Sequence, residues 1–499
     1  MRTCSLRFFL AAVSVGLALA PPPPPTPNHR SVLILGGGVA GIIAARTLHE
    51  QGIDDFLIVE ARNELGGRLR SKRFGAEGRQ VTVELGANWI QGTQEEDGPA
   101  NPILILARKH GLNATQSDFY ESIQTYDETG PVDFMDIFNK AGDAFTDLTI
   151  AGGARVQRNQ VDSSCRTGYS IVDSKPKTPH EMASEYYMFD WEYAQTPEQT
   201  SWIASSWANN FTYSASAGGF SDANLFSTDQ RGFKHFIHAE AATFLSPSQT
   251  LLNATVRSIA HSADGVVVTL VDGTRLSADF AVTTFSIGVL QNDDVKFEPA
   301  LPAWKKEAID SMAMGTYTKI FLQFEDKFWF DTQFALYADR ERGRYPVWQG
   351  LDMQGFLPGS GIVFATVTGD FSTRIEAMSD AAVQAELLSI LGSMFPNTPI
   401  PTPTAFFFPR WRADPLYRGS FSNWPAGFVG ARQGKVRANV GARLWFAGEG
   451  TSRTHFGFLH GAYFEGQDIG ARVARCVNGA GCESLPVVED VVNAAPYVV

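Results

Sequence analysis

The chain has 499 residues, of which 44% are hydrophobic and 12% are aromatic, so it can bury a large core and is long enough for more than one domain. Its formal net charge of −12 argues against nucleic acid as a partner and favours cationic partners. The nine histidines are scattered and form no pattern of metal ligands, so we expect no metal site.

The first twenty residues have the layout of a secretory signal peptide. Arg2 and Arg7 precede an apolar run over 8–19, and small residues at 18–20 stand at the spacing of a cleavage site. The run is too short to span a membrane, so we expect no stable membrane insertion, although an uncleaved anchor is the alternative. We therefore predict a signal peptide at 1–20, a proline-rich spacer at 21–30 and secretion.

A nucleotide-binding pattern follows the spacer. Residues 32–35 predict a buried parallel strand, and Gly36, Gly38 and Gly41 come directly before a helix predicted at 42–48. The first glycine permits the tight turn, the second lets the backbone approach a pyrophosphate, and the third lets helix and strand pack closely. The helix N-terminus faces the phosphate charge. This pattern predicts a Rossmann-like α/β domain.

A second strand is predicted at 56–59, and the residues after it indicate which dinucleotide binds. It ends at Glu60, whose carboxylate can accept hydrogen bonds from a ribose diol. Gly66, Gly67 and Arg68 follow, where the glycines permit close backbone approach and the arginine can bridge a phosphate and a flavin edge. This segment resembles that of the flavin amine oxidase family, which includes monoamine, polyamine and L-amino-acid oxidases and histone demethylases. The resemblance implies FAD as the cofactor.

The resemblance extends over nearly all of the chain after residue 30. It implies further cofactor contacts: Asn88 and Trp89 beside the flavin ring, Val256 at the adenine, Trp411 near the flavin, and Gly448 with Glu449 at the ribityl chain. A long helix predicted from Gly461 to about Arg475 directs its positive end at the flavin, which favours the reduced, anionic form.

Other elements follow from hydrophobic patterning. Antiparallel strands are predicted at 255–259, 265–270 and 276–282, a helix at 302–313, and strands at 316–324 and 444–449. The family fold is α/β, with a Rossmann-like FAD-binding domain built from discontinuous segments plus an α+β substrate-binding domain. On this basis we assign 31–117, 228–300 and 405–476 to the FAD-binding domain, 118–227 and 301–404 to the substrate-binding domain, and 477–499 to a C-terminal tail.

Lys319 is the predicted catalytic residue. It lies within a strand among Tyr317, Ile320 and Phe321, where a lysine is out of place unless it is used or paired. Burial would lower its pKa and make it a base, or the holder of a water near flavin N5, as the matching family lysine is. The alternative is an edge-strand lysine that faces solvent. Tyr317 points to the same side, since strand side chains repeat every two residues.

The predicted substrate site combines aromatic rings with an acidic residue. Phe421 and Phe458 match positions that flank the substrate tunnel, and Phe458 replaces a tyrosine that many family members carry. These segments look closest to those of secreted plant polyamine oxidases, in which acidic residues at the tunnel mouth hold distal ammonium groups. Glu192 matches one of these residues, whereas the other position holds the uncharged Gln91. Together with Tyr317, these four residues form the predicted substrate site.

We therefore expect a secreted, FAD-dependent amine oxidase that acts on spermine or spermidine by hydride transfer to flavin N5, with O2 as the second substrate and hydrogen peroxide as a product. FAD should bind non-covalently, because no cysteine lies between Cys165 and Cys476. An L-amino-acid oxidase is the alternative, and it would need Arg231 or Arg418 to clamp an α-carboxylate. A non-catalytic flavin-binding protein is the second alternative. A monomer is favoured.

Two further features agree with secretion. Cys476 and Cys482 stand close enough in sequence to form a disulfide. Cys165 would then be free or paired outside the chain. Glycosylation sequons begin at Asn113, Asn210 and Asn253, a number near what chance supplies.

Overall fold

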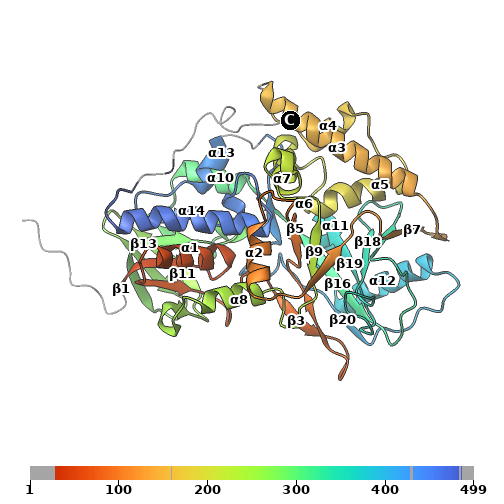
Figure 1. Cartoon of the computed structure of the whole chain (residues 1–499), viewed down its shortest axis with the longest axis horizontal. Helices are drawn as coiled ribbons and strands as arrows, with labels where there is room; N and C mark the ends of the chain where they lie inside the picture. The colour runs from red at the N-terminus through yellow and green to blue at the C-terminus, as the bar shows by residue number, and fades with distance from the viewer. Residues whose placement is uncertain (1–28, 159, 428–430, 483–484, 486–499) are drawn as a thin grey trace, which may run out of the picture.

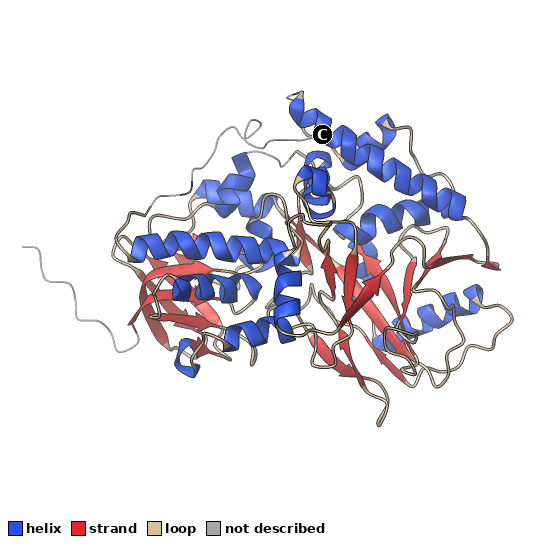
Figure 2. Cartoon of the chain, viewed as in Figure 1, coloured by secondary structure: helices blue, strands red, loops and turns tan. Residues whose placement is uncertain are grey.

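The structure is a computed structural model, and it describes residues 29–158, 160–427, 431–482 and 485. The expected signal peptide, most of the expected spacer and most of the C-terminal tail lie outside these ranges. Two large sheets stand side by side, each with its own helices (Figures 1 and 2). Among the described residues, no helix combines the length and the apolar character needed to cross a membrane.

The first sheet carries the nucleotide-binding pattern. Its strand order is β10-β2-β1-β13-β12-β11-β14, with β22 also paired to β13. The strands are β1 (His29–Leu35), β2 (Phe56–Val59), β10 (Thr250–Leu251), β11 (Val256–His261), β12 (Val266–Leu270), β13 (Arg275–Thr283), β14 (Lys296–Glu298) and β22 (Leu444–Phe446). The apolar strand β1 runs parallel to both of its neighbours. The alternating strands β11, β12 and β13 are antiparallel, as the pattern predicts.

Helices α1 (Val39–Glu50) and α14 (Leu459–Val477) pack against each other beside this sheet (Figure 1). Small residues allow the close contact: a Cβ on Gly466 would lie 2.4 Å from the carbonyl oxygen of Ala40. Helix α14 begins at Leu459, two residues before the predicted start at Gly461. Its last turn contains Cys476, which forms a disulfide with Cys482, while the free thiol of Cys165 is buried.

The second sheet has the order β20-β16-β19-β18-β17-β7-β8. The strands are β7 (Ile123–Asp127), β8 (Gly130–Pro131), β16 (Tyr317–Gln323), β17 (Phe334–Tyr337), β18 (Val347–Gly350), β19 (Ile362–Thr368) and β20 (Ala405–Phe407). Side chains of β16 alternate between two faces, and Ile320 and Leu322 belong to the core that includes helix α12 (Asp380–Met394). Strand β20 pairs with β16, so the structure departs from the predicted boundary at 405, which placed this strand in the FAD-binding domain.

Short sheets and helices connect the two halves. Small sheets are formed by β3 (Ser71–Phe74) with β4 (Val81–Glu84), by β5 (Trp89–Gln91) and β6 (Ala114–Ser117) with β9 (Asn224–Ser227), and by β15 (Ala313–Gly315) with β21 (Phe421–Asn423). A helical group lies above the second sheet (Figure 2). It contains α3 (Met135–Gln157), α4 (Cys165–Ile171), α5 (Pro179–Glu185), the π-helix η1 (Tyr186–Asp190), α6 (Trp191–Tyr193) and α7 (Trp202–Tyr213).

The remaining helices are shorter than α3, α12 and α14. They are α2 (Pro102–Lys109), α8 (His235–Ala242), α9 (Ile287–Gln291), α10 (Ala303–Ser311), α11 (Gly369–Glu376) and α13 (Ala431–Arg437), with short 3-10 turns η2 (Ala215–Ala217), η3 (Pro247–Gln249) and η4 (Glu449–Thr451). Helix α10 falls within the range 302–313 predicted for it.

Candidate active site

A cavity of about 700 Å³ is lined by residues from both halves of the molecule. Every predicted site residue except Gly41 lines this cavity: Gly36, Gly38, Glu60, Gly67, Arg68, Asn88, Trp89, Gln91, Glu192, Val256, Tyr317, Lys319, Trp411, Phe421, Gly448, Glu449 and Phe458. These residues come from segments more than 400 positions apart in the sequence. The fold therefore collects nearly the whole predicted set around one space.

The glycine turn between β1 and α1 forms one wall of this cavity. Gly36 has φ +116°, a conformation that L side chains rarely adopt, and a Cβ on Gly41 would lie 2.0 Å from the carbonyl oxygen of Gly36. In contrast, a Cβ on Gly38 would have no neighbour closer than 3.8 Å. The space in front of Gly38 and the N-terminus of α1 are therefore open to a phosphate group. These residues fit a dinucleotide.

Glu60 stands beside this turn at the end of β2. Its carboxylate accepts hydrogen bonds from the backbone N–H groups of Gly37, at 2.7 Å, and Arg62, at 2.8 Å. The side chain is buried by the protein but lines the cavity. Each carboxylate oxygen keeps acceptor capacity for a ribose hydroxyl. The two backbone contacts fix its direction.

Glu449 is a second cavity glutamate, and it lies three residues after the end of strand β22 in the C-terminal part of the chain. Its carboxylate accepts from Arg68 Nη1 at 2.9 Å, from the N–H and hydroxyl of Ser422, and from the N–H of Gly457 at 2.8 Å. It thus ties Arg68, from the N-terminal part of the chain, to two C-terminal segments of the cavity lining. Arg68 also donates to the carbonyl of Ser420 at 2.9 Å. The contact of Glu449 with a ribityl chain stays a prediction.

Lys319 is buried, with 2% of its surface exposed, so the alternative of a solvent-facing edge lysine is wrong. Its Nζ donates to the carbonyl oxygen of Gly86 at 2.7 Å and to Asn88 Oδ1 at 2.8 Å, with the Glu84 carbonyl at 3.3 Å. Burial lowers the pKa of Lys319 to about 7, against a smaller opposing effect of the Glu84 carboxylate. The amine is therefore positioned by three protein acceptors and exchanges its proton near neutral pH.

Aromatic side chains surround the space next to Lys319. Tyr317 and Phe421 lie with ring centroids 5.9 Å apart, and the Trp89 ring centroid is 5.2 Å from Lys319 Nζ. Phe458 stacks on the buried His460, with centroids 4.9 Å apart, and meets Tyr213 edge-on at 6.1 Å. Such rings contact methylene groups, tolerate a cationic nitrogen and exclude water.

Glu192 lies in the same cavity, in helix α6. Its carboxylate accepts hydrogen bonds from the Tyr213 hydroxyl at 3.3 Å and from the Gln91 amide at 3.4 Å. Gln91 Nε2 also donates to the Tyr213 oxygen at 3.0 Å. Surrounding protein raises the pKa of Glu192 to about 7, although the side chain remains partly accessible through the cavity. The group is therefore an acid whose charge changes near neutral pH.

Tyr213 contacts two of the predicted substrate-site residues, although no feature of the sequence pointed to it. It ends helix α7 directly after the sequon at 210–212, which indicates nothing about a binding site, and it reaches Gln91 and Glu192 only through the tertiary fold. Tyr213 itself does not line the cavity, but residues that were not predicted do: Phe119, Trp191, Tyr193, Phe285, Tyr417 and Asn423. The sequence offered only their aromatic or polar character, which is common in any core.

The arginines proposed for an amino-acid oxidase do not reach the cavity. Arg231 and Arg418 each pair with an aspartate, at 2.6 Å and 2.7 Å, and neither lines the cavity. Of the described cavity residues, the arginines are Arg62 and Arg68, and each already pairs with a glutamate. No described cysteine lines the cavity, and no cluster of metal ligands is found in the described ranges.

Comparison with known proteins agrees with this geometry. The family described as flavin containing amine oxidoreductase matches residues 39–477. Polyamine oxidase 1 of Zea mays is 36% identical over 475 residues, covering 91% of this chain and 92% of that protein. Polyamine oxidase 7 of Oryza sativa subsp. japonica is 34% identical over 484 residues, covering 93% of this chain and 98% of that protein.

A solved structure of wild-type putrescine oxidase bound to putrescine has the same fold, with a TM-score of 0.69 at 17% identity, covering 89% of this chain and 99% of that one. This likeness confirms the predicted α/β fold class. The glycine turn, Glu60 and the open space at Gly38 fit the cofactor FAD. The chain therefore belongs to the flavin-containing amine oxidoreductase family and is an FAD-dependent amine oxidoreductase.

Proposed function

We propose that this enzyme oxidises polyamines such as spermidine and spermine, with O2 as the final electron acceptor. The observation that carries the proposal is the combination, in one cavity, of a buried lysine, aromatic walls and the carboxylate of Glu192. A polyamine carries several cationic nitrogens separated by methylene groups, and this lining is complementary to that alternation. The polyamine oxidases of maize and rice among the relatives support the same substrate class.

The side chains divide the work of such a reaction. The reacting nitrogen must be neutral, because an ammonium has no lone pair to expel a hydride, and Lys319 in its neutral form can accept that proton directly or through a water. Ionised Glu192 binds a distal ammonium group, while Tyr317, Phe421 and Phe458 contact the methylenes and exclude water. Bound FAD supplies the hydride acceptor. With water and O2, the products are an aminoaldehyde, an amine and hydrogen peroxide.

We expect the purified enzyme to release peroxide with spermidine or spermine and not with leucine or phenylalanine. Glu192→Gln should raise the KM for spermidine about tenfold with much less effect on kcat, because the amide loses the ionic share of one contact. In the native enzyme KM should fall as pH rises through about 7, since Glu192 then becomes ionised, and the variant should lack this change. Steady-state peroxide assays over a pH series measure both effects.

The exposed Glu325→Gln is the control and should behave as the native enzyme. Turnover of leucine or phenylalanine in place of polyamines would replace this proposal by the amino-acid oxidase. An unchanged KM in Glu192→Gln would remove Glu192 from the substrate site.

We also propose that the enzyme is secreted, binds FAD non-covalently and carries N-linked glycans. The apolar run at 8–19, the disulfide of Cys476 with Cys482, and the exposed positions of Asn113 and Asn253 support this. Expression of the full chain in a secreting eukaryotic host should release protein whose electrophoretic mobility shifts after deglycosylation. Retention in the cells without such a shift would contradict secretion.

A further inference from the structure

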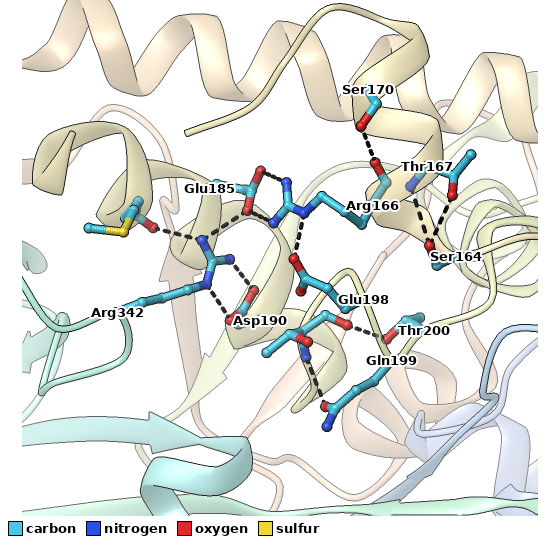
Figure 3. Close-up of polar contacts among 12 residues, drawn as sticks. Ser164, Arg166, Thr167, Ser170, Glu185, Asp190, Glu198, Gln199, Thr200 and Arg342 are labelled. Carbon is cyan, nitrogen blue, oxygen red and sulfur yellow. Dashed lines mark hydrogen bonds and ion pairs between the residues drawn. The ribbon is translucent and has the colours of Figure 1, made fainter. Parts of the chain in front are cut away.

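Five charged side chains form a continuous series of ion pairs next to the segment that carries Glu192 (Figure 3). Its order is Glu198, Arg166, Glu185, Arg342, Asp190. Figure 3 shows Glu185 between the two arginines. None of the five lines the cavity. The series therefore has no direct contact with a substrate there.

Arg342 bridges the two buried carboxylates of the series, Glu185 and Asp190. Its Nη2 and Nε donate to the two oxygens of Asp190 at 2.6 Å and 3.1 Å, and its Nη1 lies 2.9 Å from Glu185 Oε1. Arg166 donates to both oxygens of Glu185, at 2.6 Å and 2.7 Å. The side chains of Glu185 and Asp190 are only 4% and 3% exposed. Paired, planar contacts of this kind fix direction as well as distance.

The two carboxylates mark the ends of an unusual backbone segment. Glu185 is the last residue of α5, and Asp190 is the last residue of the π-helix η1, after which α6 presents Glu192. A π-helix is rare and is often retained where a side chain must be directed at a functional site. Ala194 then leaves the helix in a left-handed conformation, with φ +54°. Glu192 therefore lies in a short segment, and Arg342 holds that segment at Asp190, two residues before Glu192.

The contribution of Arg342 follows from the cost of buried charge. Without it, Asp190 would lose its cation and Glu185 would keep only Arg166. Burial already raises the pKa of Asp190 to about 6, and Arg342 opposes that rise. An uncompensated buried carboxylate protonates or moves toward water, and either change removes the contact that fixes Asp190 at the end of η1. Glu192 is two residues further along the chain, so its carboxylate would shift in the cavity.

We infer that Arg342 is a positioning residue that, through Asp190 and Glu185, holds Glu192 where it can bind the second ammonium group of a polyamine. This inference rests on the proposed function. It makes the preference for a diamine over a monoamine depend on a residue outside the cavity.

The test compares binding of 1,8-diaminooctane and octylamine to the FAD-loaded enzyme by titration calorimetry. In Arg342→Gln, the dissociation constant of the diamine should rise about tenfold, while that of octylamine should change by less than about twofold. Arg340→Gln, in the same loop but 80% exposed and paired with Glu128, is the matched control and should leave both constants unchanged. Equal weakening of both ligands, or weakening of neither, would overturn the inference.

Arg342→Lys keeps a cation beside Asp190 but loses the planar fork, so it should show a smaller loss that is again confined to the diamine. If Arg342→Gln does not fold, the Arg342→Lys variant tests the role of Arg342 alone. An unchanged preference for the diamine in Arg342→Lys would then overturn the inference. Spermidine oxidation by the native enzyme separates the two hypotheses. Its absence would contradict the proposed function, whereas oxidation together with an unchanged diamine preference in both variants would contradict only the role of Arg342.

Discussion

Replacing Lys319 by methionine should slow the flavin half-reactions about a hundredfold while FAD stays bound, because the variant keeps the volume of the side chain and removes its amine. Nζ contacts Gly86 and Asn88, and neither belongs to the glycine turn that fits the dinucleotide. Anaerobic stopped-flow reduction by spermidine, followed by mixing with O2, measures the two half-reactions. The flavin spectrum of the purified variant measures cofactor content.

The pH dependence provides a second signature of Lys319. Its pKa of about 7 means that the side chain is mostly cationic below neutral pH and mostly neutral above it. If the neutral amine accepts the proton, the limiting rate of flavin reduction should rise as pH increases through about 7, and this rise should disappear in Lys319→Met. Lys306→Met, at an exposed position, is the control. Native rates and an unchanged pH profile in Lys319→Met would exclude Lys319 from the reaction.

Gly38→Ala should yield a folded protein that lacks FAD. A Cβ at this position meets no protein atom within 3.8 Å, and the backbone φ of −74° is ordinary for alanine, so the fold should tolerate it. The added methyl group would instead occupy the space required by the pyrophosphate. Overpacking of this kind should weaken FAD binding about a hundredfold. Flavin absorbance and circular dichroism of the purified protein measure the two properties separately.

Substitutions of two other glycines serve as controls for Gly38→Ala. Gly392→Ala, in helix α12, adds a Cβ that meets nothing within 4 Å, and it should keep both fold and flavin. Gly41→Ala places a Cβ 2.0 Å from the Gly36 carbonyl oxygen, so it should lower stability itself. A yellow Gly38→Ala protein with native FAD affinity would show that the pyrophosphate does not approach this position.

Local patterns were predicted well where neighbouring residues decide the structure. The strand at 56–59 has the predicted limits, and the alternating segments of β11, β12 and β13 pair as expected. The errors lie at boundaries that distant contacts decide. Strand β20 joins the second sheet, where Phe407 lies opposite Phe321. Helix α14 starts at Leu459, whose side chain packs against a hydrophobic core formed by distant N-terminal segments. No pattern within either segment carries that information.

By itself, the sequence determined the nucleotide-binding turn, since strand, glycines, helix and acidic residue follow each other within about thirty positions and each meets a local backbone demand. It also singled out Lys319 as a charge misplaced in an apolar strand. Only the tertiary structure decided that this lysine is buried with a pKa near 7, because its acceptors Gly86 and Asn88 are more than 200 residues away. The contact of Tyr213 with Glu192 and the clamp by Arg342 likewise exist only once distant segments pack, since burial and pairing of charge depend on all the atoms around a group.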